Sequence, residues 1–397
     1  MSSGISDRSD LRNLPEWVKS FGLPPEATDA IDRWWQPAWD RIVDALPLLP
    51  VRRAPDADVA ATYEPGAEQV VFQAVAEDRP GPAWQAAFRE MWPAYRAWYL
   101  REGDDARPDL DACRAALEEY MPEIVPTWER LVELADGDEL AARCLSLWRP
   151  PAFITGCSQA AWTREGDAPV LVRNYDYPAS RLEGIVASTA WTGRRVIGMS
   201  DCLSGLIDGM NDAGLAVSLT FGGRRAVGRG FGVPIVVRYL LETCETTAQA
   251  RAVLERVPVH APQNITVLDG SGAWLTAYVG PDRAPEFSRY PATTNHQGRV
   301  EWPEYARAIR SVERERCLLD RVVDRDLTRD EFVDGFLEPP LHNTHYANGF
   351  GTVYTAAYFP TEGRVEYRWP GFTWDQSFAD FAEGTHTETF LDGRRAA

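Results

Sequence analysis

The chain has 397 residues, 41 of them basic and 59 acidic, which gives a formal net charge of −18 at pH 7. This acidity argues against general binding to nucleic acids or anionic membranes, because both need basic patches, and 45% hydrophobic residues exclude a wholly disordered chain. Lys19 is the one lysine in the sequence, which removes chemistry that needs a buried lysine, such as Schiff-base formation or a phosphate-binding P-loop.

The sequence contains no segment typical of a secretory signal or a membrane span. Its first residues are polar, and the longest apolar run, 233–241, is interrupted by Arg238. The six cysteines are scattered without a Cys-x-x-Cys pair, as is typical of free thiols in a cytosolic protein. His342 and His345 have a ligand-like spacing, but ordinary loop histidines explain it better. We therefore predict a soluble, cytoplasmic protein without a metal site.

The first 150 residues have the three- and four-residue apolar spacing of amphipathic helices. The segments with this pattern are 25–48, 83–100, 109–120, 124–135 and 138–148. Nine of the 15 tryptophans of the chain lie in this half and follow the helical period. We interpret them as core packing between helices rather than as a ligand-binding surface.

Beyond Pro151 the sequence changes to short runs rich in β-branched residues, separated by turns that contain Gly, Asp or Asn. The predicted strands are 153–163, 170–174, 185–192, 196–199, 215–221, 265–269 and 274–279, with a last hairpin of 353–359 and 364–369. Two helical stretches, 233–257 and 304–323, interrupt them. Hairpin-linked strands that alternate with helices predict an α+β fold in which helices cover antiparallel sheets.

A candidate nucleophile, Cys157, opens the first of these strands and follows Gly156. Arg173 and Asp176 lie 16 and 19 residues later, at the end of the strand that a hairpin would return beside it. A nearby cation lowers the pKa of a thiol from about 8.5 and favours the nucleophilic thiolate. The carboxylate could hold an ammonium group. A cysteine in a strand is more often only a small core residue, so the assignment depends on further motifs.

Two general bases are open for this thiol. One is the imidazole of His296, because a long separation in sequence does not forbid a Cys–His pair. The other is the α-amine that Cys157 would gain if the bond after Gly156 were broken, with a pKa of about 7.7–8.0. Gly156 suits the second route, since the absence of a Cβ lets the backbone bend and bring the thiol to the preceding carbonyl.

Five motifs in a fixed order give the second half of the chain a resemblance to a known family. They are Gly156-Cys-Ser158, Arg173-Asn-Tyr-Asp176, Asp208-Gly-Met-Asn-Asp-Ala-Gly-Leu215, Asn264-Ile-Thr266 and Thr294-Asn-His296. In this order they resemble the N-terminal-nucleophile hydrolases, and among these the acyl-coenzyme A:6-aminopenicillanic acid acyltransferase-like proteins. The resemblance to choloylglycine hydrolases and penicillin V acylases is more distant. It covers about residues 150–370.

The resemblance implies a role for each matching residue. Cys157 matches the nucleophile, which is freed by autocatalytic cleavage after the preceding glycine. Asp176 matches the acid that positions the new α-amine, and Arg173 matches the arginine beside the nucleophile. Asn295 matches the asparagine near the α-amine and the tetrahedral intermediate, and Asn264 matches a supporting strand residue.

One matching position departs from the family pattern. Thr220 stands where choloylglycine hydrolases have an asparagine that donates to the oxyanion, and its hydroxyl is a shorter donor. The family often has a substrate-facing arginine on the helix that we predict for 304–323. Arg307, Arg310 and Arg314 all qualify, and the sequence does not choose among them.

The resemblance also implies the organisation of the chain. We expect a four-layer αββα sandwich preceded by an all-helical segment, with residues 1–156 and 157–397 as the two chains after cleavage between Gly156 and Cys157. The implied activity is that of a hydrolase or acyltransferase on linear, non-peptide amides through a thioester acyl-enzyme, with no cofactor or metal.

The expected partners are a small-molecule amide or acyl donor and the protein's own cleaved N-terminal segment, with no nucleic acid and no membrane. The oligomeric state stays open. Two alternatives remain at this point. One is an uncut thiol hydrolase that uses Cys157 and His296, and the other is a non-catalytic ligand-binding scaffold of the same fold.

Overall fold

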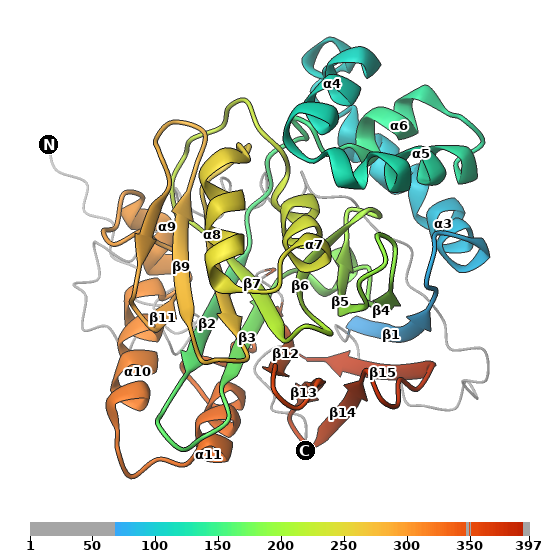
Figure 1. Ribbon diagram of the computed structural model, residues 1–397. Helices are drawn as coiled ribbons and strands as arrows, with labels where there is room; N and C mark the ends of the chain where they lie inside the picture. The colour runs from blue at the N-terminus through green and yellow to red at the C-terminus, as the bar shows by residue number, and fades with distance from the viewer. Residues whose placement is uncertain (1–67, 347–348, 350, 392–397) are drawn as a thin grey trace, which may run out of the picture. The chain divides into compact units, whose positions relative to one another are not determined.

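A computed structural model describes residues 68–346, 349 and 351–391 of the chain. The helix predicted at 25–48 lies outside these residues. Within them, the polypeptide forms two β-sheets that pack face to face, with helices on the two outer faces (Figure 1).

The larger sheet has the strand order β10-β9-β8-β7-β6-β5-β4-β1-β15 in the described residues. Its strands are β1 (Glu68–Ala76), β4 (Ile185–Thr189), β5 (Val196–Asp201), β6 (Gly205–Asn211), β7 (Leu215–Phe221), β8 (Gln263–Asp269), β9 (Trp274–Val279), β10 (Glu286–Ser288) and β15 (Gly384–Phe390). Neighbouring strands are antiparallel except for β1 and β4, which run parallel.

The smaller sheet has the order β11-β2-β3-β12-β13-β14. Its strands are β2 (Gly156–Trp162), β3 (Val170–Asp176), β11 (Ala292–Thr293), β12 (Thr352–Phe359), β13 (Arg364–Trp369) and β14 (Phe372–Ser377). The inner faces of β2 and β3 pack against β7 and β8 of the larger sheet. A buried glutamine, Gln159, joins the two sheets because its amide donates to the carbonyl of Asn264 and accepts from the hydroxyl of Ser218.

The helices complete the layers. They are α3 (Pro82–Tyr99), α4 (Leu110–Tyr120), α5 (Val125–Leu134), α6 (Glu139–Leu145), α7 (Val233–Thr243), α8 (Thr247–Arg256), α9 (Pro303–Ala308), α10 (Ser311–Val323) and α11 (Arg329–Asp334), with 3-10 turns at Asp104–Ala106, Pro122–Ile124, Ala179–Arg181 and Gly335–Leu337. Helices α7 and α8 contact the larger sheet, and α10 contacts β2 and β11 of the smaller one. The predicted αββα sandwich is confirmed.

Two predicted helices are each divided in two. The stretch 233–257 forms α7 and α8, because Thr246 caps a new helix and exchanges hydrogen bonds with Gln249 in a capping box. The stretch 304–323 forms α9 and α10, because Arg310 adopts the left-handed conformation with φ 54° and interrupts the helical ladder.

The segment before Gly156 contains a strand as well as helices. Strand β1 has the mostly apolar sequence EQVVFQAVA, and it lies between β4 and β15 in the larger sheet. We expected only helices here, because pairing with β15 joins residues more than 300 positions apart and leaves no local signal. Of the five described tryptophans in this half, Trp84, Trp98, Trp128 and Trp148 are buried and Trp92 is partly buried against the same core, as core packing predicts.

Helix α3 is fixed to the larger sheet at the turn between β5 and β6. The Trp84 indole donates to the carbonyl of Leu203 at 2.8 Å, and the Tyr95 hydroxyl donates to the carboxylate of Glu183 at 2.6 Å. Glu183 also accepts from the backbone N–H of Leu203, and Asp201 accepts from the N–H of Cys202. Two carboxylates and one phenol thus hold a buried turn whose central residues, 202 and 203, both have positive φ.

None of the described helices combines the length and the apolar character that crossing a membrane requires.

The buried carboxylate of Asp201 makes stability depend on pH. Burial and the neighbouring charge of Glu183 raise the pKa of Asp201 to about 8, whereas the unfolded carboxyl has a pKa of about 3.9. The folded state therefore keeps a proton between about pH 4 and pH 8 that the unfolded chain has lost, so this contribution to stability falls as the pH rises through that window. Asp201→Asn should therefore remove a decrease in the free energy of unfolding on the order of 1.4 kcal/mol per pH unit.

Urea unfolding at several pH values between 5 and about 8 measures this slope. The matched control is Asp212→Asn, which alters an exposed carboxylate paired with Arg194 and Arg195 at the next turn of the same sheet. An Asp201→Asn protein with the pH dependence of the wild type would contradict the prediction.

Candidate active site

The register of the β2–β3 hairpin sets the position of Cys157. Cys157 pairs with Tyr175 and Gly156 pairs with Asp176. Because side chains alternate along a strand, Cys157 and Arg173 share the inner face that packs on the larger sheet. Asp176 points to the opposite face, where α10 lies. The hairpin predicted from the sequence is confirmed.

The Cys157 thiol is fully buried and has two polar neighbours. The guanidinium Nη2 of Arg173 lies 3.2 Å from Sγ, and the hydroxyl of Thr155 lies 3.3 Å from it. Burial raises the pKa of this thiol, and the opposing effects of Arg173 and Thr155 do not outweigh it. The expected position of Arg173 is therefore confirmed, while the expectation that the cation makes the thiol acidic does not hold in the intact chain.

A buried ion pair, between Arg314 and Asp176, lies on the other face of β3. Arg314, from α10, donates to Asp176 Oδ2 at 2.6 Å and to Asn295 Oδ1 at 2.8 Å. The other oxygen of Asp176 accepts from the Thr352 hydroxyl at 2.7 Å. Burial raises the pKa of Asp176, although Arg314 and the hydroxyl of Thr352 oppose this effect.

Asn295 joins this ion pair to the backbone of Cys157. Its Oδ1 accepts from the backbone N–H of Cys157 at 2.9 Å, and its Nδ2 donates to the carbonyls of Thr155 and Phe221. The Tyr305 hydroxyl also donates to the Thr155 carbonyl, at 2.6 Å. The peptide units on both sides of Gly156 are thus held by buried side chains from the segment after β11 and from α9. Gly223 allows this segment to approach closely, since a Cβ there would lie 2.2 Å from the carbonyl oxygen of Asn295.

Asn264 and Thr220 lie side by side on β8 and β7 and contact the same segment. Asn264 donates to the carbonyls of Thr294 and His296 and to the hydroxyl of Thr220. The Thr220 hydroxyl in turn donates to the carbonyl of Thr294 at 2.6 Å. Asn264 therefore cross-links the strands around the site, as a supporting residue would. Because the hydroxyl hydrogen of Thr220 is already used, serving an oxyanion would require this bond to break.

His296 points away from the thiol. Its Nδ1 lies 2.9 Å from the Ser311 hydroxyl, and its Nε2 lies 3.1 Å from the carboxylate of Glu315, both on α10. Asn295 and His296 are consecutive in an extended segment, so when the first side chain faces Cys157 the second faces the helix. Both ring nitrogens have partners other than the thiol.

Of the three candidate arginines, Arg314 alone is buried at the site. Arg307 is exposed, and Arg310 forms an ion pair with Glu313 at the surface. The amphipathic pattern of α10 contained the necessary signal, because Ser311, Arg314 and Leu318 have helical spacing and form its buried face. Thr155 and Tyr305, which sequence reasoning missed, carry no pattern of their own and are found only through the fold.

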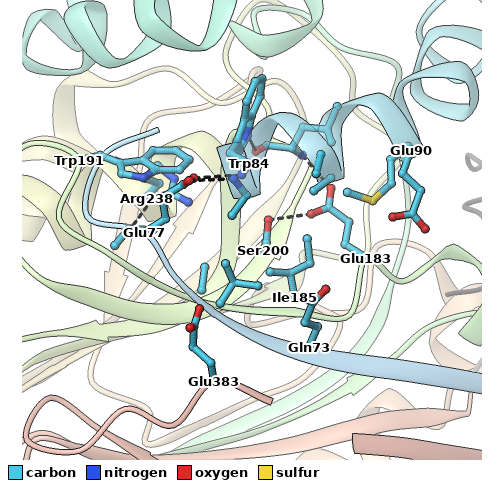
Figure 2. Close-up of a pocket in the computed structure, with 18 residues that line it drawn as sticks. Gln73, Glu77, Trp84, Glu90, Glu183, Ile185, Trp191, Ser200, Arg238 and Glu383 are labelled. Carbon is cyan, nitrogen blue, oxygen red and sulfur yellow. Dashed lines mark hydrogen bonds between the residues drawn. The ribbon is translucent and has the colours of Figure 1, made fainter. Parts of the chain in front are cut away.

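A cavity of about 260 Å³ lies on the face of the larger sheet that points away from the smaller sheet and the thiol (Figure 2). Apolar side chains from α3, β1 and β4 line it, together with Trp191, Arg238, Glu183 and Glu77. Ala187, which lines the cavity, pairs with Gly198 of β5, so both residues are on the cavity side of the sheet. The next residue of β5, Met199, pairs with Asp208, so both are on the other side, where Asp208 contacts Arg173. The sheet therefore separates this cavity from the thiol.

The geometry supports nucleophilic chemistry at sulfur. The Cys157 thiol lies beside the Arg173 guanidinium near the start of β2, and the backbone N–H of the same residue donates to Asn295. A second cation, Arg314, acts on the thiol from α10. In the described part of the chain, no group of three or more His, Cys, Asp or Glu side chains has the arrangement of a metal site.

Comparison with known proteins supports the resemblance found in the motifs. Residues 162–374, slightly more than half of the chain, match the family described as acyl-coenzyme A:6-aminopenicillanic acid acyl-transferase. The match includes Arg173, Asp176 and Asn295 and begins five residues after Cys157. No curated protein matches the chain.

Similar solved structures include three enzymes. They are a variant of the conjugated bile acid hydrolase from Clostridium perfringens (12% identity, TM-score 0.40, covering 58% of this chain and 96% of that chain), the Caenorhabditis elegans orthologue of N-acylethanolamine-hydrolyzing acid amidase (16%, 0.38, 52% and 93%), and penicillin V acylase from Agrobacterium tumefaciens (15%, 0.34, 56% and 86%).

Arg314 should be necessary for stability as well as for the site. Arg314→Met leaves Asp176 buried without a cation, and breaking one partner out of a buried ion pair costs about 3–5 kcal/mol. Chemical denaturation measures this loss. The matched control is Arg316→Met on the same helix, where the side chain is exposed and the change should stay within about 0.5 kcal/mol. Equal effects of the two substitutions would show that Arg314 has no special role.

Proposed function

The chain belongs to the acyl-coenzyme A:6-aminopenicillanic acid acyl-transferase family, and from this premise we propose that it is a self-processing enzyme with an N-terminal cysteine nucleophile. Its substrate would be a linear, non-peptide amide, whose acyl group it hydrolyses or transfers. One observation carries the proposal. The Cys157 thiol contacts Arg173, and the backbone nitrogen of the same residue donates to Asn295, directly after a glycine.

The first step of the proposed mechanism is cleavage of the chain itself. The sulfur of Cys157 attacks the carbonyl carbon of Gly156, and the thiol proton passes to the departing amide nitrogen. The C–N bond breaks, which leaves a thioester between Gly156 and Sγ and a free α-amine on Cys157. Water then hydrolyses the thioester, so the products are a Gly156 carboxylate and a free thiol. The step uses no co-reactant except water.

The second step repeats this chemistry on the substrate. The new α-amine has a pKa of about 7.7–8.0 and takes the thiol proton as a general base. The thiolate attacks the carbonyl carbon of the substrate amide. The amine part of the substrate leaves with the proton that the α-amine had taken, and a thioester acyl-enzyme forms. Water resolves it in hydrolysis, and an acceptor amine resolves it in acyl transfer. The substrate, the thiol and the acceptor supply every atom of the products, and the α-amine only carries a proton between them.

The neighbours of Cys157 have contacts that suit their proposed roles. Asn295 accepts from the nitrogen that becomes the α-amine, and Arg314 fixes the carboxamide of Asn295 and the carboxylate of Asp176 together. Arg173 offers a cation to the developing thiolate. Asn264 would support the segment that carries Asn295, because it donates to the carbonyls of Thr294 and His296. The oxyanion donor remains Thr220 in this proposal, after its hydroxyl turns from the carbonyl of Thr294.

The N-terminal segment is the proposed partner of the catalytic chain after cleavage. Strand β1 has backbone pairs on both sides, with β4 and with β15. Helix α3 adds the buried hydrogen bonds of Trp84 and Tyr95 to the turn after β5. These contacts do not involve the Gly156–Cys157 bond, so they support a product in which the two pieces stay together.

Self-cleavage is tested by the mass of the purified protein. We expect two chains of 156 and 241 residues on a denaturing gel, with Cys157 as the first residue of the larger one, and co-elution of the two under native conditions. Cys157→Ala should yield one intact chain, and Cys202→Ala, a matched substitution of another buried cysteine, should be cleaved normally. A single intact wild-type chain that hydrolyses amides would refute the proposal.

The alternative base is tested by His296→Ala. Both nitrogens of this ring contact α10, so its loss should change cleavage and turnover less than tenfold, whereas Cys157→Ala should abolish both. The measurement is amide hydrolysis over a panel of simple N-acyl compounds, combined with intact mass. Complete loss of activity in an uncut, well-folded His296→Ala protein would instead favour the uncut thiol hydrolase with His296 as base.

A further inference from the structure

A buried carboxylate, Asp208, lies behind the arginine that contacts the nucleophile. Asp208 is on the inner face of β6, and its Oδ2 lies 2.7 Å from Nη1 of Arg173. Both side chains are fully buried. Two tyrosines of β12 also donate to this carboxylate, Tyr354 to Oδ2 at 2.5 Å and Tyr358 to Oδ1. Asp208 therefore accepts three hydrogen bonds from two strands of the opposite sheet.

The guanidinium of Arg173 is held from several directions. Nη1 bonds to Asp208, Nη2 contacts the Cys157 sulfur, and the group lies over the Tyr175 ring at 4.6 Å. On β12 the residue directly opposite Arg173 is Ala356, whose small side chain leaves space for the guanidinium between Tyr354 and Tyr358. The carboxylate of Asp208 is the only acidic partner of this cation in the described residues.

We propose that Asp208, together with the hydroxyls of Tyr354 and Tyr358, is the positioning residue that holds Arg173 against the Cys157 thiol. This inference rests on the proposed function, since it concerns the activation of the same nucleophile. Asp208 touches neither the sulfur nor the segment around Gly156 and acts through Arg173. The two tyrosines fix the carboxylate on the larger sheet to the smaller sheet, so the cation cannot turn away from the thiol without losing a buried charge-assisted bond.

A simple ion pair without such a role makes different predictions. If Asp208 only neutralised Arg173, removing its negative charge would favour the thiolate and lower the pKa of the thiol. If it positions Arg173, its removal lets the guanidinium leave Sγ, and the loss of a cation at contact distance raises the thiol pKa by about one to three pH units. The direction of the change therefore separates the two roles.

The other charged and titratable groups near the thiol stay the same in this comparison. Asp176 and Arg314 act on it electrostatically from the other face of β3 and from α10, and the phenols of Tyr175 and Tyr305 lie close by. None of them bonds to Asp208, so a change that follows substitution of Asp208 acts through Arg173.

The experiment is a titration of the Cys157 thiolate by its ultraviolet absorbance. The signal is the difference between each protein and the same protein with Cys157→Ser, which removes the contributions of tyrosines and other cysteines. Asp208→Asn should raise the thiol pKa by about one to three pH units. Asp212→Asn, a carboxylate at the exposed turn that follows β6, is the matched control and should leave it unchanged.

A second variant keeps the test valid if Asp208→Asn does not fold. Tyr358→Phe retains both charges and removes one hydroxyl from the carboxylate, so it should raise the thiol pKa in the same direction by a smaller amount. An unchanged or lower thiol pKa in Asp208→Asn, or in Tyr358→Phe where that variant alone folds, would overturn the proposal.

The titration requires neither cleavage nor a substrate. If the wild-type chain remains uncut and inactive, the proposed function fails while the effect of Asp208 on the thiol is still measured. If the chain is cleaved and active but the thiol pKa does not respond to Asp208, the positioning role fails while the proposed function stands.

Discussion

The register between β2 and β3 is the constraint on which the site depends. Pairing of Gly156 with Asp176 directs the thiol and Arg173 into the space between the sheets, and directs Asp176 towards α10. A slip by one residue would exchange the two faces, because side chains alternate along a strand. The thiol would then face the helices and lose its cation. The turn between the strands and their neighbours β11 and β12 therefore help to set the geometry of the site.

Two ion pairs on opposite faces of β3 follow from this register. Arg173 pairs with Asp208 between the sheets, and Asp176 pairs with Arg314 below α10. A buried charge without a partner costs several kcal/mol, so each cation near the thiol is compensated by a carboxylate. As a result, burial dominates and the thiol pKa is raised in the intact chain. In the proposed mechanism the thiol becomes reactive only after cleavage, which adds an α-amine that can take the thiol proton.

The sequence was sufficient for the parts of the fold that depend on local patterns. Alternation and turn residues predicted β2, β3, β7, β8, β9 and the β12–β13 hairpin, and counting along the first hairpin brought Arg173 to Cys157. Contacts between distant segments left no such pattern. Arg314 reaches Asp176 only because α10 covers the smaller sheet, and Asp208 reaches Arg173 only because the two sheets face each other. The raised thiol pKa also required the fold, since burial cannot be counted from spacing.

The position of β1 bears on whether the proposed cleavage would disturb the fold. Strand β1 precedes Gly156 in sequence, yet it lies inside the larger sheet with β4 on one side and β15 on the other. Removing it would expose the edges of both neighbours, whose unpaired backbone groups would need new partners. A cut after Gly156 breaks none of these pairs. In the proposed mechanism it would change the chemistry of one nitrogen, that of Cys157, and would leave the backbone pairs of β1 with β4 and β15 in place.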